Sequence, residues 1–536
     1  IREYYIIIML IDNIIKLGVF KYMKRFNTTG LCNPKKHYMV DISDKLEKIK
    51  VLIENEEYFV INRPRQYGKT TTLTALEKSL NEKYLVIDIS FEGIGDIVFS
   101  KEEKFVTEFI NLIDDMLDCV DENLREIFRK LSLEVSTLSN LSRLISKFIK
   151  NLDKEVILII DEVDKSSNNQ IFLNFLGMLR NKYLDREKGR AVTFKSVILA
   201  GVYDIKNLKL KLRPDEERKY NSSWNIAVPF NVDMSLHKEG IENMLNEYAL
   251  DKNLAFDTSK AAEFIYFYTN GYPFLVSRLC QIIDEDLKAS WNEETMVRAV
   301  KLLLLENNTL FDDLVKNMEN NKELQNLIES IVINGKIISF NLGNPLINLG
   351  TMFGILSERD NKVSISNRIY EQYIYDYLSS KIEVSNNVLE KYNFKSDFIE
   401  GNGLNIEKIL LRFQQFMKEQ YSKKDAIFLE REGRLLFLAF IKPIINGVGF
   451  DFKEVQISEE KRLDVVITYN NNKYIIELKV WHGEEYHEKG LKQLANYLDI
   501  NNQDRGYLLV FNFNKNKEYK KEELIVEEKE IFEVFV

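Results

Sequence analysis

The chain has 536 residues, which corresponds to roughly three domains at about 150 residues each. Hydrophobic residues make up 45% and charged residues 29%, as in a globular protein with a substantial core. The net charge of −9 argues against a surface coated in basic residues for nonspecific nucleic-acid binding, although a local basic cleft is compatible with it. Cys32, Cys119 and Cys280 are far apart and odd in number, so they imply neither a disulfide framework nor a zinc site, and a reducing cytoplasm is the expected location.

The N-terminal residues 1–25 are apolar without forming a clear membrane span. Asp12 and Lys16 interrupt the run "IREYYIIIMLIDNIIKLGVFKYM", which is also short for crossing a bilayer. The run lacks the small-residue cleavage site of a signal peptide. We expect an N-terminal extension of uncertain status, such as a small docking helix, and no membrane partner.

The first motif lies in "YFVINRPRQYGKTTTLTALEKSL", residues 58–80, where a strand-like run precedes a loop and then leucines at helical spacing. Gly68, Lys69 and Thr70 end a G-x-x-x-x-G-K-[ST] motif, but Arg63 stands where its first glycine should be. In such a loop, backbone N–H groups and the helix N-terminus hold phosphates, the lysine reaches the β and γ phosphates, and the hydroxyl binds Mg²⁺. The alternative is a surface turn with a solvated lysine.

A second motif, about 90 residues later, favours the phosphate-binding interpretation. "EVILIIDEVDK" (155–165) is an apolar strand ending in Asp161 and Glu162, a Walker B arrangement in which the first would hold Mg²⁺ through water and the second would orient the attacking water. A third apolar strand, "FKSVILAGVYD" (194–204), lies where a sensor strand is expected. The sequence therefore predicts an ATP site with Mg²⁺, and the loop residues expected to bind the nucleotide are Arg63, Pro64, Arg65, Gln66, Tyr67, Gly68, Lys69, Thr70 and Thr71.

The segments "FNTTGLCNPKKHYMV", "INRPRQYGKTTTL", "SVILAGVYDIKNLK", "RPDEERKYNSSWNIAVPF" and "TNGYPFLVSRLC" together resemble the bacterial AAA-like ATPases of the P-loop class. Those proteins carry an R-P-R-x-[FY]-G-K-[ST] loop, so Arg63 resembles the arginine with which that family's loop begins. The resemblance covers about residues 26–380. It implies an αβα ATPase core over 26–235, a helical lid over 236–319 and a winged helix over 320–380.

The same resemblance implies further nucleotide contacts. His37 and Tyr38, in "HYMV" before the first strand, would lie near the adenine. Arg278 in "GYPFLVSRLC" would be a sensor near the phosphates, although a cation on a helix surface is an equal alternative. Arg180 is a weaker candidate for a finger acting on a neighbouring subunit, in which case the chain forms a homo-oligomer.

The region 320–380 has its own pattern. "INLGTMFGILSERDNKVSISNRIYEQYIYDYL" predicts a helix, a two-stranded wing around Asp360-Asn361 and another helix, after an earlier helix and turn at "LQNLIESIVINGK". A helical spacer is the alternative, and the sequence leaves open whether a winged helix here contacts DNA or docks on the lid. The polar residues 381–404 are expected to be a linker to a separate domain over 405–536.

That last domain contains a candidate metal site. In "KRLDVVITYNNNKYIIELKVW" (461–481), alternation places Glu477 and Lys479 on one face of a strand, and a hairpin turn brings Asp464 to the neighbouring strand. Two carboxylates suit a hard divalent cation, Mg²⁺ or Mn²⁺, and a lysine can position the water and offset developing negative charge. A salt-bridged surface pair is the alternative for so short a pattern.

Flanking features strengthen this hypothesis. Glu432, in the amphipathic helix "FLEREGRLLFLAFIKPI", is a further candidate metal ligand. In "EKGLKQLANYLD", Lys489, Gln493 and Tyr497 recur every four residues and share a helix face, and "RGYLLVFNF" predicts another buried strand.

This αβββαβ order with these polar groups resembles the PD-(D/E)XK restriction-endonuclease-like fold, and more closely the nuclease domain fused behind AAA-like ATPases. The pattern "RLDVVI…YIIELKVW…GLKQLANYLD" matches that domain in its key residues. Leu463, in place of proline, precedes Asp464, a departure that the wider superfamily tolerates. The fold class expected for the whole chain is multidomain α/β.

Two functions of different class follow. The first is an ATP-regulated, metal-dependent nuclease whose partner is nucleic acid, with DNA favoured over RNA, and for which defence against mobile DNA is an analogy with such fusions. The second is a regulatory or signalling ATPase that binds DNA or protein and uses its nuclease-like domain only for binding. The intact set Asp464, Glu477 and Lys479 favours the first.

Overall fold

The computed structural model describes residues 24–166, 169–202, 224–332, 336–385, 398–401, 403–420, 433, 436–441, 464–469, 472–514 and 517–536. Two compact units result: one extends to Leu314 and includes Asn348–Leu356, and the other comprises Val315–Ile347 and Ser357–Val536. Residues 1–23 of the expected extension at 1–25 lie outside the described residues. Among the helices that are described, none is long and apolar enough to cross a membrane.

The first unit is built on a parallel sheet of four strands. The strands β1 (Phe59–Asn62), β2 (Leu85–Ser90), β3 (Val156–Asp161) and β4 (Ser196–Gly201) follow the spatial order β1-β4-β3-β2. Their near-continuous apolar runs are buried on both faces, as expected for a parallel sheet. The strand β4 therefore lies between β1, which leads into the first motif, and β3, which ends in the second motif.

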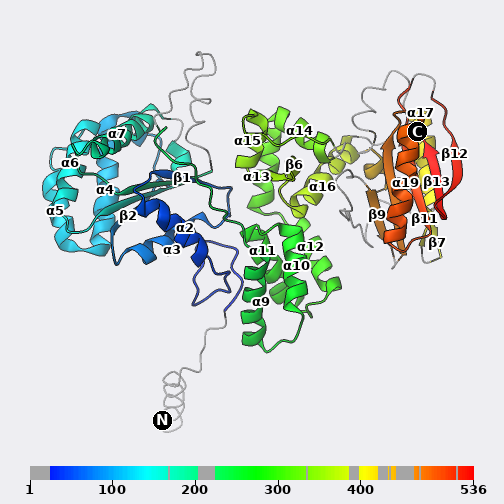
Figure 1. Ribbon diagram of the computed structural model, residues 1–536, viewed down its shortest axis with the longest axis horizontal. Coiled ribbons are helices and arrows are strands. Elements are labelled where there is room, and N and C mark those ends of the chain that lie inside the picture. Colours follow the sequence, from blue (N-terminus) through cyan, green and yellow to red (C-terminus); the bar gives the residue numbers. More distant parts are fainter. Residues whose placement is uncertain are drawn as a thin grey trace, which may run out of the picture. The chain divides into compact units, whose positions relative to one another are not determined.

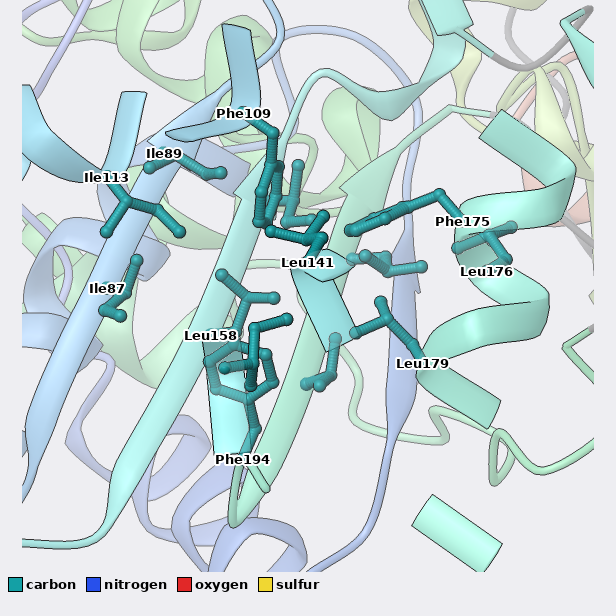
Figure 2. Close-up of a cluster of buried hydrophobic side chains, with 14 of the residues drawn as sticks. Ile87, Ile89, Phe109, Ile113, Leu141, Leu158, Phe175, Leu176, Leu179 and Phe194 are labelled. Atoms are coloured by element: carbon teal, nitrogen blue, oxygen red, sulfur yellow. The ribbon is translucent and has the colours of Figure 1, made fainter. Parts of the chain in front are cut away.

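Helices cover both faces of this sheet (Figure 1). The helices α2 (Ser43–Glu54) and α3 (Lys69–Leu80) lie on one face, and α4 (Glu102–Val120), α5 (Glu122–Ser132), α6 (Leu138–Lys150) and α7 (Gln170–Glu187) lie on the other. Figure 2 shows the second layer, where Ile87 and Leu158 from the strands face Phe109, Leu141 and Phe175 from the helices. The expected αβα sandwich is confirmed.

A helical layer follows the core. It consists of α9 (Lys238–Lys252), α10 (Thr258–Thr269), α11 (Pro273–Gln281), a π-helical turn η4 (Ile282–Leu287), α12 (Glu293–Leu304) and α13 (Thr309–Glu319). Asn253 and Asn270 end α9 and α10 in the left-handed conformation, which asparagine adopts more readily than most residues. These helices agree with the predicted lid.

The next elements are α14 (Lys322–Val332), α15 (Pro345–Met352), the hairpin of β5 (Leu356–Arg359) and β6 (Lys362–Ile365), and α16 (Arg368–Ser385). Asp360 and Asn361 join the two strands with φ values of 52° and 60°, as a two-residue hairpin turn requires. This is the element order expected for a winged helix. The described part of the expected linker contains the end of α16 and a short hairpin of β7 (Ile399–Glu400) and β8 (Gly403–Leu404).

The C-terminal sheet is mixed. Its strands β9 (Asp464–Tyr469), β10 (Asn472–Val480), β11 (Arg505–Phe511), β12 (Lys521–Val526) and β13 (Lys529–Phe535) have the order β12-β13-β11-β10-β9, and β10, β11 and β13 run parallel. The helix α19 (Glu484–Ile500) connects β10 to β11 and packs on one face, and α17 (Ile406–Gln420) packs on the other through Phe413 and Phe511. The strands β12 and β13 are elements that the sequence pattern did not predict.

Candidate functional site

The loop between β1 and α3 has the conformation of a phosphate-binding loop. Gly68 adopts φ +78°, in the left-handed region that favours glycine, and its carbonyl accepts the first helical hydrogen bond from the Thr72 N–H at 2.9 Å. The buried Lys69 donates from Nζ to the carbonyls of Arg63 and Pro64, at 2.9 and 3.0 Å. Burial lowers the pKa of Lys69, while the carboxylate of Glu162 counteracts that shift. A surface turn with a solvated lysine is excluded.

The two sequence motifs meet at one hydrogen bond. The Thr70 hydroxyl donates to Asp161 Oδ2 at 3.1 Å, and Asp161 Oδ1 accepts from the Glu162 N–H at 2.8 Å. A hydroxyl and a carboxylate are the hard oxygen ligands that Mg²⁺ prefers, so these residues fit the expected ion. Burial, followed by the charge of Asp161, raises the pKa of Glu162, which keeps this carboxyl a better proton acceptor than an exposed glutamate.

A third acid belongs to this cluster. Asp164 accepts a hydrogen bond from the Val202 N–H just beyond β4, and its carboxyl lies so close to Gly201 that a Cβ there would be 2.7 Å from Oδ1. The glycine at the end of β4 is therefore required by close approach. Asp164 was not predicted from the sequence, although it stands two residues after the Asp-Glu pair.

Arg63, where most such loops have glycine, has its guanidinium turned to the protein backbone. It donates to the carbonyls of Asn62 and Val232, both at 2.8 Å, and lies 5.1 Å from the ring centroid of Phe230. The side chain thus ties the loop entry to the segment that follows residue 224. Its predicted role in nucleotide binding stays a prediction, and any such contact falls to the backbone of the loop.

The four residues after Arg63 contact the lid helices and the end of α15. Arg65 pairs with Asp313 at 3.3 Å, Gln66 donates to the Thr309 hydroxyl at 3.0 Å, and Tyr67 packs edge-on against Tyr272 with ring centroids 4.8 Å apart. The Tyr272 hydroxyl also donates to the Arg65 carbonyl, and Gly354 lies so close to Pro64 that a Cβ there would collide with the proline ring. Residues 64–67 of the loop therefore contact elements outside the sheet and α3.

His37 and Tyr38, the residues predicted near the base, lie in the segment before α2. The Thr71 hydroxyl accepts from the Cys32 N–H at 3.3 Å, which brings the segment before α2 to the loop. His37 Nδ1 accepts from the Asn33 N–H, and burial together with Arg25 lowers the pKa of its imidazole.

Tyr38 is 2% exposed and packs between Phe26 and Tyr248, with ring centroids 5.1 and 5.3 Å away. Burial raises the pKa of its phenol to about 12, and its hydroxyl has no hydrogen-bond partner among the described residues. The ring joins the N-terminal segment to α9, and its predicted contact with adenine stays a prediction.

The two candidate arginines are placed differently. Arg278 forms ion pairs within the lid, with Glu306 at 2.6 Å and Asp286 at 3.0 Å. This network satisfies the guanidinium without a phosphate, and the sensor role stays a prediction. Arg180 on α7 is half-buried, and its Nε has no hydrogen-bond partner in the described part of the chain.

The C-terminal site is built on β10 and α19. Glu477, 6% exposed, and Lys479 lie on one face of β10 as predicted, and Lys479 Nζ is 2.9 Å from Glu477 Oε1 and 3.3 Å from Gln493 Oε1. A Cβ on Gly490 would be 3.1 Å from Lys479 Cε, so the glycine makes room for the lysine stem against α19. The pair is therefore largely buried and held from two elements, which excludes an exposed surface salt bridge.

The remaining predicted ligands are described in part. The register places Asp464 of β9 directly opposite Glu477 of β10, and nothing further is described for that side chain. Glu432 lies outside the described residues. Among the side chains that are described, no group of three or more acids, histidines or cysteines is arranged to hold a metal, so the ligand set stays a prediction.

The three residues predicted to share a face of α19 differ in their surroundings. Tyr497 is buried in the core with Leu494, whereas Lys489 is exposed and pairs with Glu485 at 2.9 Å. One buried pair was missed: His487 Nε2 lies 2.9 Å from an oxygen of Glu533, which is fully buried. The apolar residues around Glu533 in "KEIFEVFV", all of which are β-branched or aromatic, were the available signal for the strand that carries it.

Comparisons with known proteins find a matching family for each of the two parts of the chain. The family described as AAA-like domain matches residues 44–376, and the PD-(D/E)XK nuclease superfamily matches residues 446–522. No curated protein matches the chain. A Walker-type ATPase of Pyrococcus abyssi is 14% identical and aligns over 65% of this chain and 99% of its own, with a TM-score of 0.44.

Two other solved structures are similar over the same region. Cdc6p from Pyrobaculum aerophilum is 14% identical and aligns over 66% of this chain and 97% of its own, with a TM-score of 0.31. The ORC2 protein of Aeropyrum pernix is 10% identical and aligns over 67% of this chain and 98% of its own, with a TM-score of 0.34. Because the AAA-like match spans more than half of the residues, the chain belongs to the AAA-like domain family, and it carries a C-terminal domain of the PD-(D/E)XK nuclease superfamily.

Proposed function

We propose that this protein hydrolyses ATP at the P-loop and cleaves nucleic acid, with DNA as the substrate, at the C-terminal site, and that the nucleotide state controls cleavage. The ATPase part is supported above all by the hydrogen bond between Thr70 and Asp161. The nuclease part is supported by the contacts of Lys479 with the buried Glu477 and with Gln493.

The residues of the first site have separable roles. Lys69 supplies the cation for the β and γ phosphates, because its ammonium is already held inside the loop by two carbonyls. Thr70 and Asp161 would hold Mg²⁺, which neutralises phosphate charge when bound. Glu162 accepts a proton from the attacking water and orients it.

The residues of the C-terminal site also have separate roles. Asp464 and Glu477 would hold the divalent cation, Mg²⁺ or Mn²⁺, which polarises the scissile phosphate when bound. Lys479 orients the water and offsets negative charge that develops on the phosphate. Gln493 fixes the lysine through its side-chain oxygen, 3.3 Å away.

Regulation by nucleotide is supported by the contacts of the loop. Residues 64–67 touch Tyr272, Thr309, Asp313 and Gly354, and none of these four belongs to the sheet or to α3. Thr309 and Asp313 belong to α13, and Gly354 follows the end of α15 at Met352. A change in loop conformation on nucleotide binding or hydrolysis would therefore act directly on the contacts between the loop and these elements.

The proposal is tested by incubating supercoiled plasmid with the full chain, Mg²⁺ or Mn²⁺, and ATP or no nucleotide. The wild type is compared with Glu477→Ala and with Glu162→Gln. We expect metal-dependent nicking that Glu477→Ala abolishes and Glu162→Gln alters. Nucleotide turnover without any cleavage would instead support a regulatory ATPase that uses its nuclease-like domain for binding.

A further inference from the structure

An exposed aromatic ring lies beside Lys479. Tyr486, in the first turn of α19, is 48% exposed, and its ring centroid is 5.5 Å from Lys479 Nζ. The imidazole of His482 packs edge-on against the same ring, with centroids 5.3 Å apart and planes at 80°. The tyrosine is thus held in place by two neighbours while much of its ring faces solvent.

The position of Tyr486 on α19 follows from the helical repeat. Residues 486, 490 and 493 share one side of the helix, since they are separated by four and then three positions. Gly490 is the residue against which the Lys479 stem lies, and Gln493 contacts the Lys479 ammonium. The exposed ring and the two partners of Lys479 therefore line the same flank of α19.

The acidic residues of this turn do not obstruct that flank. Glu484 and Glu488 are exposed and lie on nearly the opposite side of α19 from Tyr486, because two positions correspond to about half a turn of the 3.6-residue repeat. Glu485 is paired with Lys489 at 2.9 Å. The side that carries Tyr486 therefore offers Lys479 and an aromatic face, which is the combination that single-stranded nucleic acid binds.

We propose that Tyr486 is a stacking site for an unpaired nucleobase next to the phosphate that Lys479 engages, so that the nuclease acts on single-stranded DNA in preference to continuous duplex. The inference rests on the proposed nuclease function and names its substrate class. In a duplex, the faces of the bases are covered by their neighbours, whereas an unpaired base is free to stack on an aromatic side chain. Every base has such a face, so the site selects strand state and not sequence.

The test compares cleavage of one labelled oligonucleotide as a single strand and as a blunt duplex, using the full chain. The wild type should have the higher kcat/KM on the single strand. Tyr486→Ala should lower the ratio of single-strand to duplex kcat/KM by roughly 5- to 150-fold, the range for loss of one base–aromatic contact. Tyr486→Phe keeps the ring and should retain the ratio, as should the control Ile525→Ala, which changes an exposed side chain on the edge strand β12.

A second readout does not require turnover. The same single strand carries 2-aminopurine, whose fluorescence is quenched by stacking, and Ca²⁺ replaces Mg²⁺. We expect quenching by the wild type and by Tyr486→Phe, and a loss of part of this quenching with Tyr486→Ala. Quenching that Tyr486→Ala leaves unchanged, or a wild type that prefers the duplex, would overturn the stacking site. Absence of cleavage of either substrate by the wild type would refute the nuclease function, while the quenching series would still decide the role of Tyr486.

Discussion

The Thr70 hydroxyl and the Asp161 carboxylate are hydrogen-bonded at 3.1 Å although 91 residues separate them in the chain. Thr70 stands in the first turn of α3, and Asp161 is the last residue of β3. Both the helix start and the strand end lie at the carboxyl edge of the same parallel sheet, because β1 and β3 run in the same direction on either side of β4. This edge is where open α/β sheets bind ligands.

Lys69→Ala should lower ATP turnover by at least about 100-fold and weaken nucleotide binding, because it removes the ammonium that we propose contacts the β and γ phosphates. Turnover is measured by phosphate release and binding by titration calorimetry. Lys78→Ala, at an exposed position of the same helix, is the matched control and should behave as wild type. Unchanged turnover in Lys69→Ala would rule out the phosphate-binding role.

Glu162→Gln should lower hydrolysis by about 100- to 10,000-fold, the range for loss of a general base, while ATP binding stays near the wild-type affinity. The amide no longer accepts a proton, but the Asp161 and Thr70 oxygens remain. The variant should accumulate with ATP bound, as judged by nucleotide extracted after gel filtration, and its rate of DNA cleavage should differ from that of the wild type. If binding and hydrolysis fell together, Glu162 would be a binding residue and not the base.

Arg63→Gly restores the usual loop sequence and should nevertheless destabilise the protein. It removes two charge-assisted hydrogen bonds, to Asn62 and Val232, each worth about 1.5–3 kcal/mol, and adds backbone freedom. The first thermal transition of the full chain, followed by calorimetry, should shift to lower temperature by several degrees. Arg63→Lys should fall in between, since one ammonium serves two carbonyls less well than the guanidinium fork. A more stable Arg63→Gly protein would show that the arginine is not structural.

Glu477→Ala and Lys479→Ala should separate metal binding from cleavage. The first removes an oxygen ligand, so divalent-metal affinity and cleavage should fall together. The second removes a cation that repels the metal, so affinity should persist while cleavage falls, by about 100-fold or more. Gln493→Ala should be milder, because it only orients Lys479. Calorimetric titration with Mn²⁺ and the plasmid assay distinguish these outcomes.

Asp313→Arg tests the coupling between the loop and the lid. The variant places a second cation against Arg65, whose guanidinium is 3.3 Å from Asp313 Oδ2 in the wild type. The ratio of cleavage with ATP to cleavage without it should move toward one, and Asp313→Arg combined with Arg65→Asp should recover it. Because an exposed ion pair contributes at most about 1 kcal/mol, the thermal stability should change little. A ratio that stays at the wild-type value in both proteins would show that this contact does not transmit the nucleotide state.

Local sequence patterns determined much of the architecture. The apolar runs ending in Asn62, Asp161 and Gly201 predicted β1, β3 and β4 of the first sheet, whereas β2 was not predicted. The triplet from Gly68 to Thr70 predicted the loop and the start of α3. Alternation along β10 placed Glu477 and Lys479 on one face. Each of these signals works within a few residues, because strand and helix periods fix which side chains are neighbours.

Other features depended on tertiary contacts that no short pattern encodes. The guanidinium of Arg63 binds a carbonyl 169 residues away, and Tyr38 is buried against a lid helix. The strand β13, with its buried Glu533, was not predicted for two reasons. Its neighbour β12 is an exposed, charged edge strand, and the turn between the two strands is Glu527-Glu528, at φ 50° and 65°. Asn-Gly at these two positions would have been the recognisable signal of a hairpin. Which polar side chain is buried, and against what, is decided by contacts between residues far apart in sequence, since desolvation depends on the whole surrounding structure.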